Sequence, residues 1–183
     1  MDVPPIETER LELLPLPEAF IEALVERRRE QAAELGLTLP EDWPDDHDAR
    51  FLHFRLRQMR ADEAWRQWLV RGIVLRADGR PMIGHIGFHG PPGVNAKRRP
   101  DAVEVGYTVF PAHRRQGYAT EALRALIGWT HREHSIRHFI ASVAPDNDPS
   151  LAIVRRLGFV ETGSHWDDDD GLELEWELDL SAG

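Results

Sequence analysis

The sequence contains no cysteine, which excludes disulfide bonds, thiolate metal sites and a cysteine nucleophile. Lysine is almost absent as well, because Lys97 is the only one among 22 cationic side chains. No apolar run approaches the roughly 18 residues that a membrane-spanning helix requires. Residues 1–12 carry acids and prolines instead of the basic and then apolar pattern of a signal peptide. We therefore expect a cytoplasmic protein without a membrane partner.

The net charge of −10 at pH 7 argues against nucleic acid as a partner. Much of the negative charge lies at the C-terminal end, which has no Lys or Arg after position 160 but nine acidic residues: Glu161, Asp167, Asp168, Asp169, Asp170, Glu173, Glu175, Glu177 and Asp179. A solvated strand edge that resists aggregation is one explanation for this run. An acidic surface that attracts a cationic acceptor is the other.

The pattern of apolar residues predicts one α+β domain over residues 1–183, with a mixed, mostly antiparallel sheet and helices on both faces. Alternating apolar residues predict strands at 10–16, 72–76, 81–89, 103–109, 136–143, 159–166 and 172–180. Apolar residues three and four apart predict helices at 17–35, 49–69, 119–130 and 150–157. The segment 49–69 is either one partly exposed helix or two short ones. Asp48 is the expected N-cap of the second helix and Gly36 the expected C-cap of the first. Gly84 and Gly87 indicate a bulge or a close backbone approach within their strand.

The stretch from Val103 to Trp129 organises the chain. It reads as a strand, a basic turn that begins after Pro111, and a helix whose apolar face starts at Ala119. The first N–H groups of such a helix have no intrahelical partner, and its dipole is positive at that end. Gly117 would let a diphosphate approach the backbone closely. The sequence therefore predicts a phosphate-binding turn in the centre of the domain.

These residues carry a family resemblance. Arg114-x-x-Gly117-x-Ala119 resembles the [RQ]-x-x-G-x-[GA] signature of the GNAT acyltransferases. Four further segments, in the same order along the chain, resemble the RimJ/RimL-like ribosomal-protein N-acetyltransferase branch: Glu104-Val105-Gly106-Tyr107, Tyr118-Ala119-Thr120-Glu121-Ala122-Leu123, Asn147-x-x-Ser150 and Leu157-Gly158-Phe159. The resemblance extends from about residue 10 to 180. A single glycine motif is weak, whereas several in the right order are specific.

The resemblance implies a GNAT fold in which two central strands splay apart and acetyl-CoA lies in the gap. Residues 103–160 would form the acetyl-CoA-binding core, and residues 10–70 the variable helices on the acceptor side. The residues that this implies for acetyl-CoA binding are Thr108, Val109, Phe110, Arg114, Arg115, Gln116, Gly117, Tyr118, Ala119, Thr120 and Asn147. The backbone of 108–110 would bond the pantetheine arm, and the turn at 114–120 would cradle the diphosphate.

Acetylation of an amine needs a base for the ammonium proton and a donor for the departing thiolate. Glu104, in the central strand, is our first choice of base, acting directly or through water; His85 and His89 on the neighbouring strand are the second choice. Many GNAT enzymes have a tyrosine acid where this chain has Val154. The resembled branch instead implies that the Ser150 hydroxyl bonds the sulfur. Helix capping is an alternative role for Asn147 and Ser150.

The predicted function is acetyl-CoA-dependent N-acetylation of a primary amine, either a protein N-terminus or a small molecule. A non-catalytic acyl-CoA-binding module on the same fold is the alternative. A monomer and a homodimer are both compatible with the sequence. His131, His134 and His138 do not form a convincing metal set, and no metal is assigned. Aromatic and sulfur side chains could line the acceptor site or belong to the core, which we favour: Phe51, Phe54, Met59, Trp65 and Trp68.

Overall fold

The computed structural model describes residues 3–28, 30, 35–168 and 171–181. Its sheet has the strand order β1-β2-β3-β4-β5-β6-β8-β7. The strands are β1 (Ile6–Glu7), β2 (Leu11–Pro15), β3 (Arg71–Leu75), β4 (Met82–Phe88), β5 (Ala102–Val109), β6 (His138–Val143), β7 (Val160–Asp167) and β8 (Gly171–Asp179). The helices are α1 (Glu18–Val25), α3 (Asp46–Ala61), α4 (Tyr118–His134) and α5 (Asp148–Arg156), with short 3-10 turns η2 (Glu63–Trp65) and η3 (Pro111–His113).

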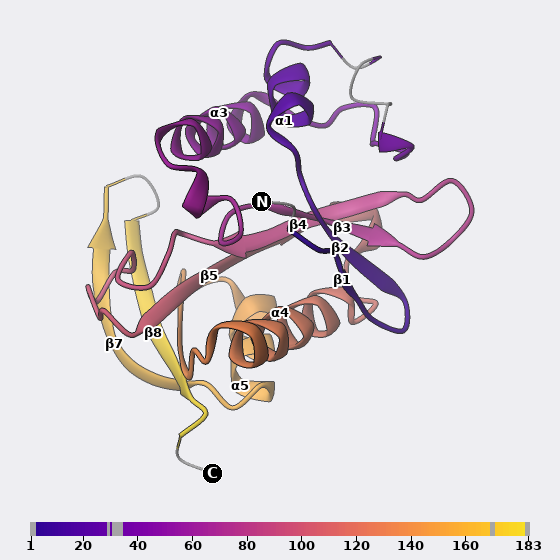
Figure 1. Ribbon diagram of the computed structural model, residues 1–183. Helices are drawn as coiled ribbons and strands as arrows, with labels where there is room; N and C mark the ends of the chain where they lie inside the picture. Colours follow the sequence, from indigo (N-terminus) through magenta and orange to yellow (C-terminus); the bar gives the residue numbers. More distant parts are fainter. Residues whose placement is uncertain (1–2, 29, 31–34, 169–170, 182–183) are drawn as a thin grey trace.

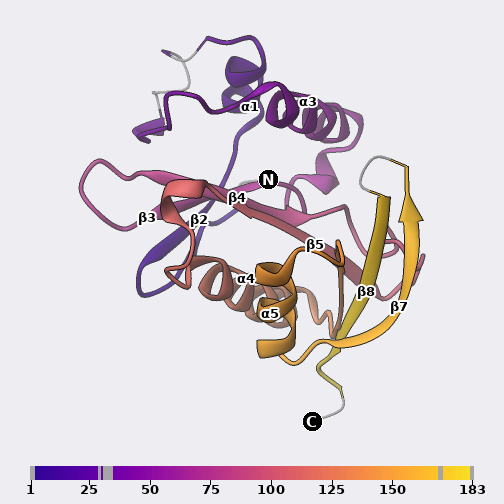
Figure 2. The ribbon, with the colours of Figure 1, turned by 180° about the vertical axis from the view of Figure 1, so that it is seen from behind.

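Helices cover both faces of the sheet. Figures 1 and 2 show α1 and α3 together on one face and α4 and α5 on the other. Among the described strands, neighbours pair antiparallel except for β5 and β6, which run parallel. This arrangement confirms the predicted α+β GNAT fold.

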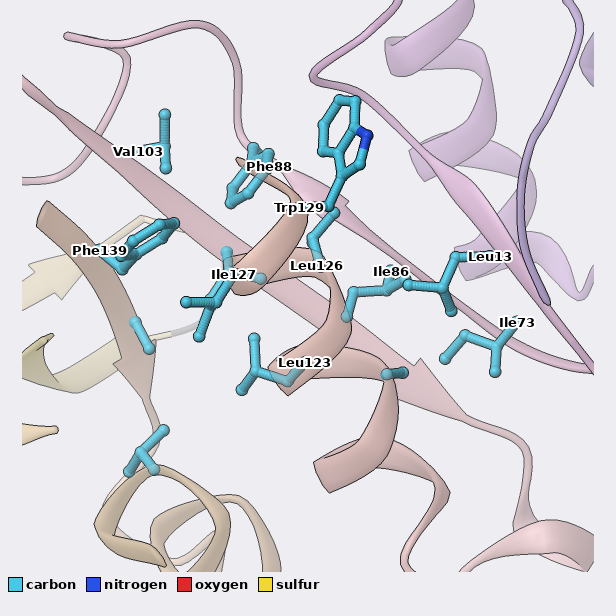
Figure 3. Close-up of a cluster of buried hydrophobic side chains, with 14 of the residues drawn as sticks. Leu13, Ile73, Ile86, Phe88, Val103, Leu123, Leu126, Ile127, Trp129 and Phe139 are labelled. Atoms are coloured by element: carbon cyan, nitrogen blue, oxygen red, sulfur yellow. The ribbon is translucent and has the colours of Figure 1, made fainter. Parts of the chain in front are cut away.

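The core has one half on each face of the sheet. On the α4 side, Leu123, Leu126 and Ile127 pack against strand side chains such as Ile86 and Phe139 (Figure 3). On the other side, α1 and α3 pack on the sheet through a separate group of buried residues that includes Leu52, Leu56, Val74 and Phe110. Because strand side chains alternate between faces, Val103, Val105 and Val109 of β5 face α4, while Glu104, Gly106 and Thr108 face α3.

The sheet opens between β5 and β6. Their parallel ladder joins Ala102 to His138 and Glu104 to Ile140, and β5 continues beyond it to Val109 without this partner. β6 instead pairs along its whole length with β8 on its other side. The structure thus contains the predicted splay, and it begins directly after Glu104.

The prediction of one long first helix was wrong. α1 ends at Val25, where Arg27 adopts a left-handed φ of 59° and the Arg28 N–H bonds the Ala23 carbonyl. The usual signal for a helix end is a glycine in the left-handed conformation, and this position has an arginine instead. Because that conformation costs a residue other than glycine about 1 kcal/mol, the end of α1 could not be predicted from the sequence. Residues 29 and 31–34 of the predicted helix lie outside the described residues.

The predicted start of the second helix was also wrong. Asp45, three residues earlier than expected, is the N-cap of α3, and Asp45 and Asp48 form a reciprocal capping box. Asp48 accepts from the Asp45 N–H, so both side chains are used at the helix start. α3 ends at Ala61, because Asp62 leaves the helical conformation and caps η2 instead.

The two glycines of β4 mark close backbone approaches, as predicted. A Cβ at Gly84 would lie 2.1 Å from the Thr108 carbonyl oxygen, and one at Gly87 would lie 2.5 Å from the Leu69 carbonyl oxygen. Any side chain at either position would push neighbouring backbone aside. No helix in the described part of the chain is both long and apolar enough to cross a lipid bilayer.

Candidate active site

The N-terminus of α4 is open and uncapped. Gly117 is the N-cap residue, with a left-handed φ of 82° and no side chain to bond the first N–H groups of the helix. Arg115 before it is also left-handed, with φ of 63°, and residues 114–117 are exposed. Successive N–H groups in such a turn point to one side and form a cradle for an anion. The backbone of Gly117 is open to an approaching group: among the described residues, a Cβ built there would meet only the Arg10 guanidinium, at 3.5 Å.

The gap beside β5 exposes alternate backbone groups of this strand. Thr108 pairs with His85 of β4, and the Phe110 N–H donates to the Ile83 carbonyl, so these two residues are bonded toward β4. By alternation, the backbone groups of Tyr107 and Val109 point toward the gap. The Val109 carbonyl already accepts from the Arg114 side chain. Of the predicted segment 108–110, only Val109 therefore presents its N–H to the gap, and Tyr107, which the sequence reasoning missed, does the same.

Ser150 lies at the α5 side of this gap. Its backbone N–H donates to the Asn147 side chain, so Asn147 does act as the N-cap of α5. The Ser150 side chain approaches the Tyr107 hydroxyl, which is buried and makes no hydrogen bond of good geometry to the residues that the structure describes. Burial raises the pKa of Tyr107, and the Ser150 contact offsets this in part. Val154, where a tyrosine acid could stand, is a fully buried core residue.

Glu104 lies at the point where the gap begins, and only 2% of its surface is exposed. Its Oε1 accepts from the Ser142 hydroxyl at 2.6 Å, and its Oε2 accepts from the Ala96 N–H at 2.6 Å. The His89 Nδ1 is 3.7 Å from the same Oε2. Unlike Glu104, His89 is half-exposed, with 44% of its side chain accessible. The carboxylate is therefore held rigidly, and His89 is its contact toward solvent.

A cavity of about 260 Å³ lies between α3 and the sheet, on the opposite face from α4. Gly87 and Gly106, which pair across β4 and β5, are among its lining residues. The His89 ring lies over Gly106, where a Cβ would come within 3.3 Å of Nε2. Tyr107 and Thr108 also line the cavity, so the same segment of β5 borders both the cavity and the gap.

The wall of this cavity carries charged and titratable groups from α3. Asp48, Phe51 and Arg55 line it opposite His85 of β4. His85 stacks on the Phe51 ring with centroids 5.0 Å apart, and burial, aided by the Arg55 guanidinium, lowers the pKa of His85 to about 4. His85 is therefore neutral at pH 7. Burial also raises the pKa of Asp48 above its ordinary value.

The side chains proposed for the acceptor wall divide between several roles. Phe51 lines the cavity, whereas Met59 and Trp68 are buried in the core, on opposite faces of the sheet. Trp65 packs against the core below α3, and Phe54 is 46% exposed. The core interpretation therefore holds for most of them.

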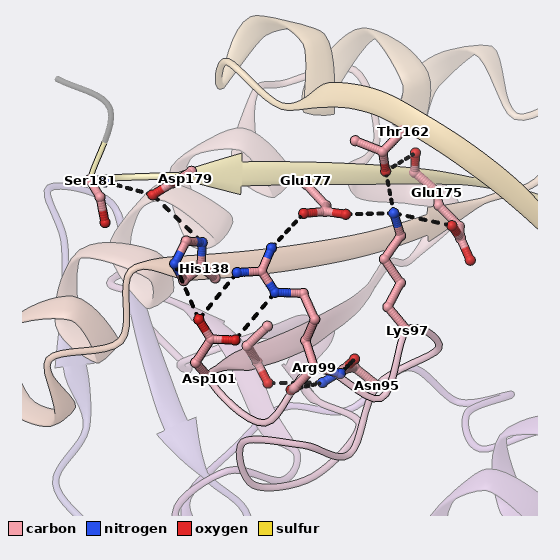
Figure 4. Close-up of polar contacts among 11 residues, drawn as sticks. Asn95, Lys97, Arg99, Asp101, His138, Thr162, Glu175, Glu177, Asp179 and Ser181 are labelled. Atoms are coloured by element: carbon pink, nitrogen blue, oxygen red, sulfur yellow. Dashed lines mark hydrogen bonds and ion pairs between the residues drawn. The ribbon is translucent and has the colours of Figure 1, made fainter.

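The acidic C-terminal hairpin is partly neutralised. Lys97 contacts Glu175 and Glu177, and Arg99 contacts Glu177 and Asp101, which links the loop before β5 to β8 (Figure 4). These two β8 acids therefore act as structural partners of a basic loop. Asp169 and Asp170 lie outside the described residues.

The three histidines at the end of α4 and the start of β6 have separate surroundings. His131 bonds the Ile136 carbonyl, His134 packs against Trp68 and Trp129, and His138 lies between Asp101 and Asp179. Within the residues that the structure describes, no three His, Cys, Asp or Glu side chains are grouped as metal ligands would be.

Comparison with known proteins places these features in a family. The model of the acetyltransferase (GNAT) domain matches residues 10–160. The chain is 27% identical over 158 residues to the uncharacterized N-acetyltransferase YjdG of Bacillus subtilis (strain 168), which covers 85% of this chain and 89% of the relative. A shorter match, 44% identical over 57 residues, is to aminoglycoside N(6')-acetyltransferase type 1 of Acinetobacter haemolyticus, and covers 31% and 39% of the two chains.

Solved structures share the fold at low sequence identity. RimL, the ribosomal L7/L12 alpha-N-protein acetyltransferase solved with coenzyme A, has a TM-score of 0.65 and 20% identity, over 98% of this chain and 100% of that chain. An acetyltransferase from Agrobacterium tumefaciens str. C58 has a TM-score of 0.64 and 23% identity, over 97% and 95%.

Proposed function

This chain belongs to the GNAT acetyltransferase family, and from that premise we propose that it acetylates a primary amine held in the cavity between α3 and the sheet. The acyl donor of this N-acetyltransferase is acetyl-CoA. The observation that carries the proposal is the position of the splay. The ladder between β5 and β6 stops at Glu104, and the β5 segment beyond it borders the cavity on one face while its gap opens toward the uncapped end of α4.

On the donor side, the turn at 114–120 would hold the diphosphate through its N–H groups and arginines. The N–H groups of Tyr107 and Val109 would bond the pantetheine arm and the thioester oxygen, and the exposed side chain of Asn147, the N-cap residue of α5, would bind the pantetheine amide. Residues 103–160 would thus form the donor-binding core, and residues 10–70 the acceptor side. Donor recognition in this scheme depends mainly on backbone groups, since the gap supplies few polar side chains.

Acetyl-CoA supplies an activated thioester carbonyl, which the neutral amine attacks directly. The new C–N bond forms as the C–S bond breaks, and the nitrogen then releases one proton, which balances the proton that the thiolate takes up. Before the attack, the ammonium ion must already have lost another proton. We assign that proton to His89 and Glu104 together. His89 lines the cavity and takes the proton, and the buried Glu104 carboxylate 3.7 Å away stabilises the imidazolium that results. His85 is the alternative base on the same wall, with a pKa of about 4 that makes it weaker at pH 7.

The departing sulfur would receive its hydrogen bond from Ser150. Tyr107 lies beside Ser150 with its hydroxyl buried and protonated at neutral pH, because burial raises its pKa. Many GNAT enzymes have a tyrosine acid at the position of Val154. Here the hydroxyls of Tyr107 and Ser150 would pass a proton to the thiolate instead.

The acceptor is a primary amine, either a peptide N-terminus or a small molecule, and it arrives as a cation. Asp48 on the cavity wall, together with the acidic residues after position 160, would favour its approach. Screening amines and N-terminal peptides for release of the coenzyme A thiol tests the function directly. Release above hydrolysis with at least one amine is expected, and release that no amine stimulates would contradict the proposal.

A further inference from the structure

Arg55 is a buried cation that has no acidic partner among the residues that the structure describes. Only 8% of its surface is exposed, and burial lowers its pKa to about 10, which still leaves it charged at neutral pH. No carboxylate of the described chain forms an ion pair with it, whereas Arg60 at the end of α3, with 47% of its side chain exposed, pairs with Glu18 and Glu22. A buried charge is costly unless it is paired, so its presence calls for an explanation.

The contacts of Arg55 leave part of its guanidinium unused. Its Nη1 donates to the Gln58 side chain and to the His89 carbonyl, each at 2.9 Å. The group also lies over the Phe51 ring, 5.0 Å from its centroid. An arginine has five N–H donors arranged as a fork, and both of these hydrogen bonds come from one end of that fork. The side chain lines the cavity, and its Nε and Nη2 donate to no residue that the structure describes.

Phe51 and the Gln58 contact hold the guanidinium at this wall, which is where an acceptor would lie. The other cavity groups do not supply an anion for it. His85 is neutral at pH 7, because burial and the Arg55 guanidinium lower its pKa, and Asp48 forms no ion pair with Arg55 and uses one carboxylate oxygen in the capping box of α3. A carboxylate on the acceptor itself would complete the fork with two parallel charge-assisted bonds.

We propose that Arg55 binds an acidic group on the acceptor, so that the substrate is a primary amine that also carries a carboxylate. The proposal rests on the proposed function, since it concerns the same cavity. It adds that the ammonium end faces Asp48 and His89, while the carboxylate end faces Arg55. A cavity of about 260 Å³ accommodates an amino acid or the first residues of a peptide.

Binding in the presence of coenzyme A tests this inference without requiring turnover. The probes are α-amino acids against their carboxamides, and Ser-Glu against Ser-Gln as peptides with amidated C-termini. For the wild type, calorimetric titration should give about 10- to 100-fold tighter binding of the acidic member of at least one pair. Arg55→Gln should bind the two members equally. Arg55→Lys, which keeps the charge but not the fork, should retain part of the preference.

The matched control is Arg57→Gln, an exposed arginine two residues along the same helix, which should keep the wild-type preference. A general disturbance of the cavity by Arg55→Gln would weaken both members of each pair alike and leave their ratio unchanged. Such an unchanged ratio, or the absence of any acidic preference in the wild type, overturns the inference. Thiol release is measured separately, so a failure of the proposed function shows as no turnover with any amine, whichever way the binding ratio falls.

Discussion

The two faces of the sheet recognise ligands by different means. On the α4 face, the exposed groups are backbone N–H groups of the α4 turn and of β5, which the glycine at 117 and the splay of β5 leave open. On the α3 face, the cavity presents polar side chains, of which Arg55 and His85 are buried and Asp48 and His89 are partly exposed. A backbone site tolerates many side chains around it, whereas a side-chain site changes with each substitution. The α4 face therefore suits a constant donor, and the α3 face suits a variable acceptor.

The largest effect is expected from a substitution on the donor face. Gly117→Glu should abolish coenzyme A binding, because it places a negative charge at the N–H cradle and a side chain at a left-handed position. Calorimetric titration with coenzyme A measures the loss. Gly36→Glu is the matched control, because Gly36 is also left-handed, with φ of 65° and open space around it, but lies in the acceptor half. Equal affinities in the two variants would rule out the α4 turn as the diphosphate site.

Glu104 lies where the two faces meet. Glu104→Gln should lower kcat by about 10²–10⁴, the usual range for loss of acid–base catalysis, because His89 loses the carboxylate that stabilises its imidazolium; coenzyme A affinity should change little. The amide has the same shape and can keep the contacts to Ser142 and Ala96, so charge is the main loss. Steady-state kinetics at pH 7 measures the effect, and Glu161→Gln on the exposed part of β7 is the control. An unchanged kcat would return Glu104 to a structural role.

His85 offers a test of the acceptor face that needs no substrate. Its folded pKa of about 4 is below the unfolded value of 6.5, so the unfolded chain takes up this proton first as the pH falls. The contribution to stability is therefore intact above about pH 6.5 and decreases between pH 6.5 and 4. Between pH 7 and 4.5 the wild type should lose about 2–3 kcal/mol more unfolding free energy than His85→Gln.

Urea unfolding at the two pH values measures this difference. The exposed His53 of α3 provides the control His53→Gln, which should follow the wild type. If His85→Gln loses as much stability as the wild type, the imidazole is not desolvated in the cavity wall.

The smallest effect is expected at the C-terminal hairpin. Replacing the four aspartates at 167–170 by asparagine should lower kcat/KM for a cationic amine by a few-fold at low salt, and less at physiological salt, where charges are screened over about 8 Å. Kinetics at two ionic strengths measures it. A kcat/KM and a salt dependence that both stay at wild-type values would leave these residues a purely solvating role.

The sequence predicted the donor half well because its signals are local. Strand alternation, Gly117 and the apolar face from Ala119 each fix a backbone conformation within a few residues, and β5 and α4 begin within one residue of the predicted positions. In the acceptor half, α1 ends at a left-handed arginine instead of a glycine, and α3 starts at an aspartate three residues before the predicted one. The local residue pattern does not determine the end of α1 or the start of α3.

The candidate site shows the same division. Motifs pointed to Glu104 and Ser150, but the strand pairing that turns the Phe110 N–H away from the gap is a property of register. The burial of Arg55 without an ion pair to a described residue could not be predicted either, because it depends on how α3 packs on the sheet. The contact between His89 and Glu104 likewise arises from the chain leaving β4 beside β5.

The central claim is that donor and acceptor are bound by separate faces of one sheet. Titration of coenzyme A into Gly117→Glu and Arg55→Gln under identical conditions tests it most directly. The account predicts that the first variant loses coenzyme A binding while the second binds it with wild-type affinity. Equal losses in both variants, or a loss confined to Arg55→Gln, would contradict it.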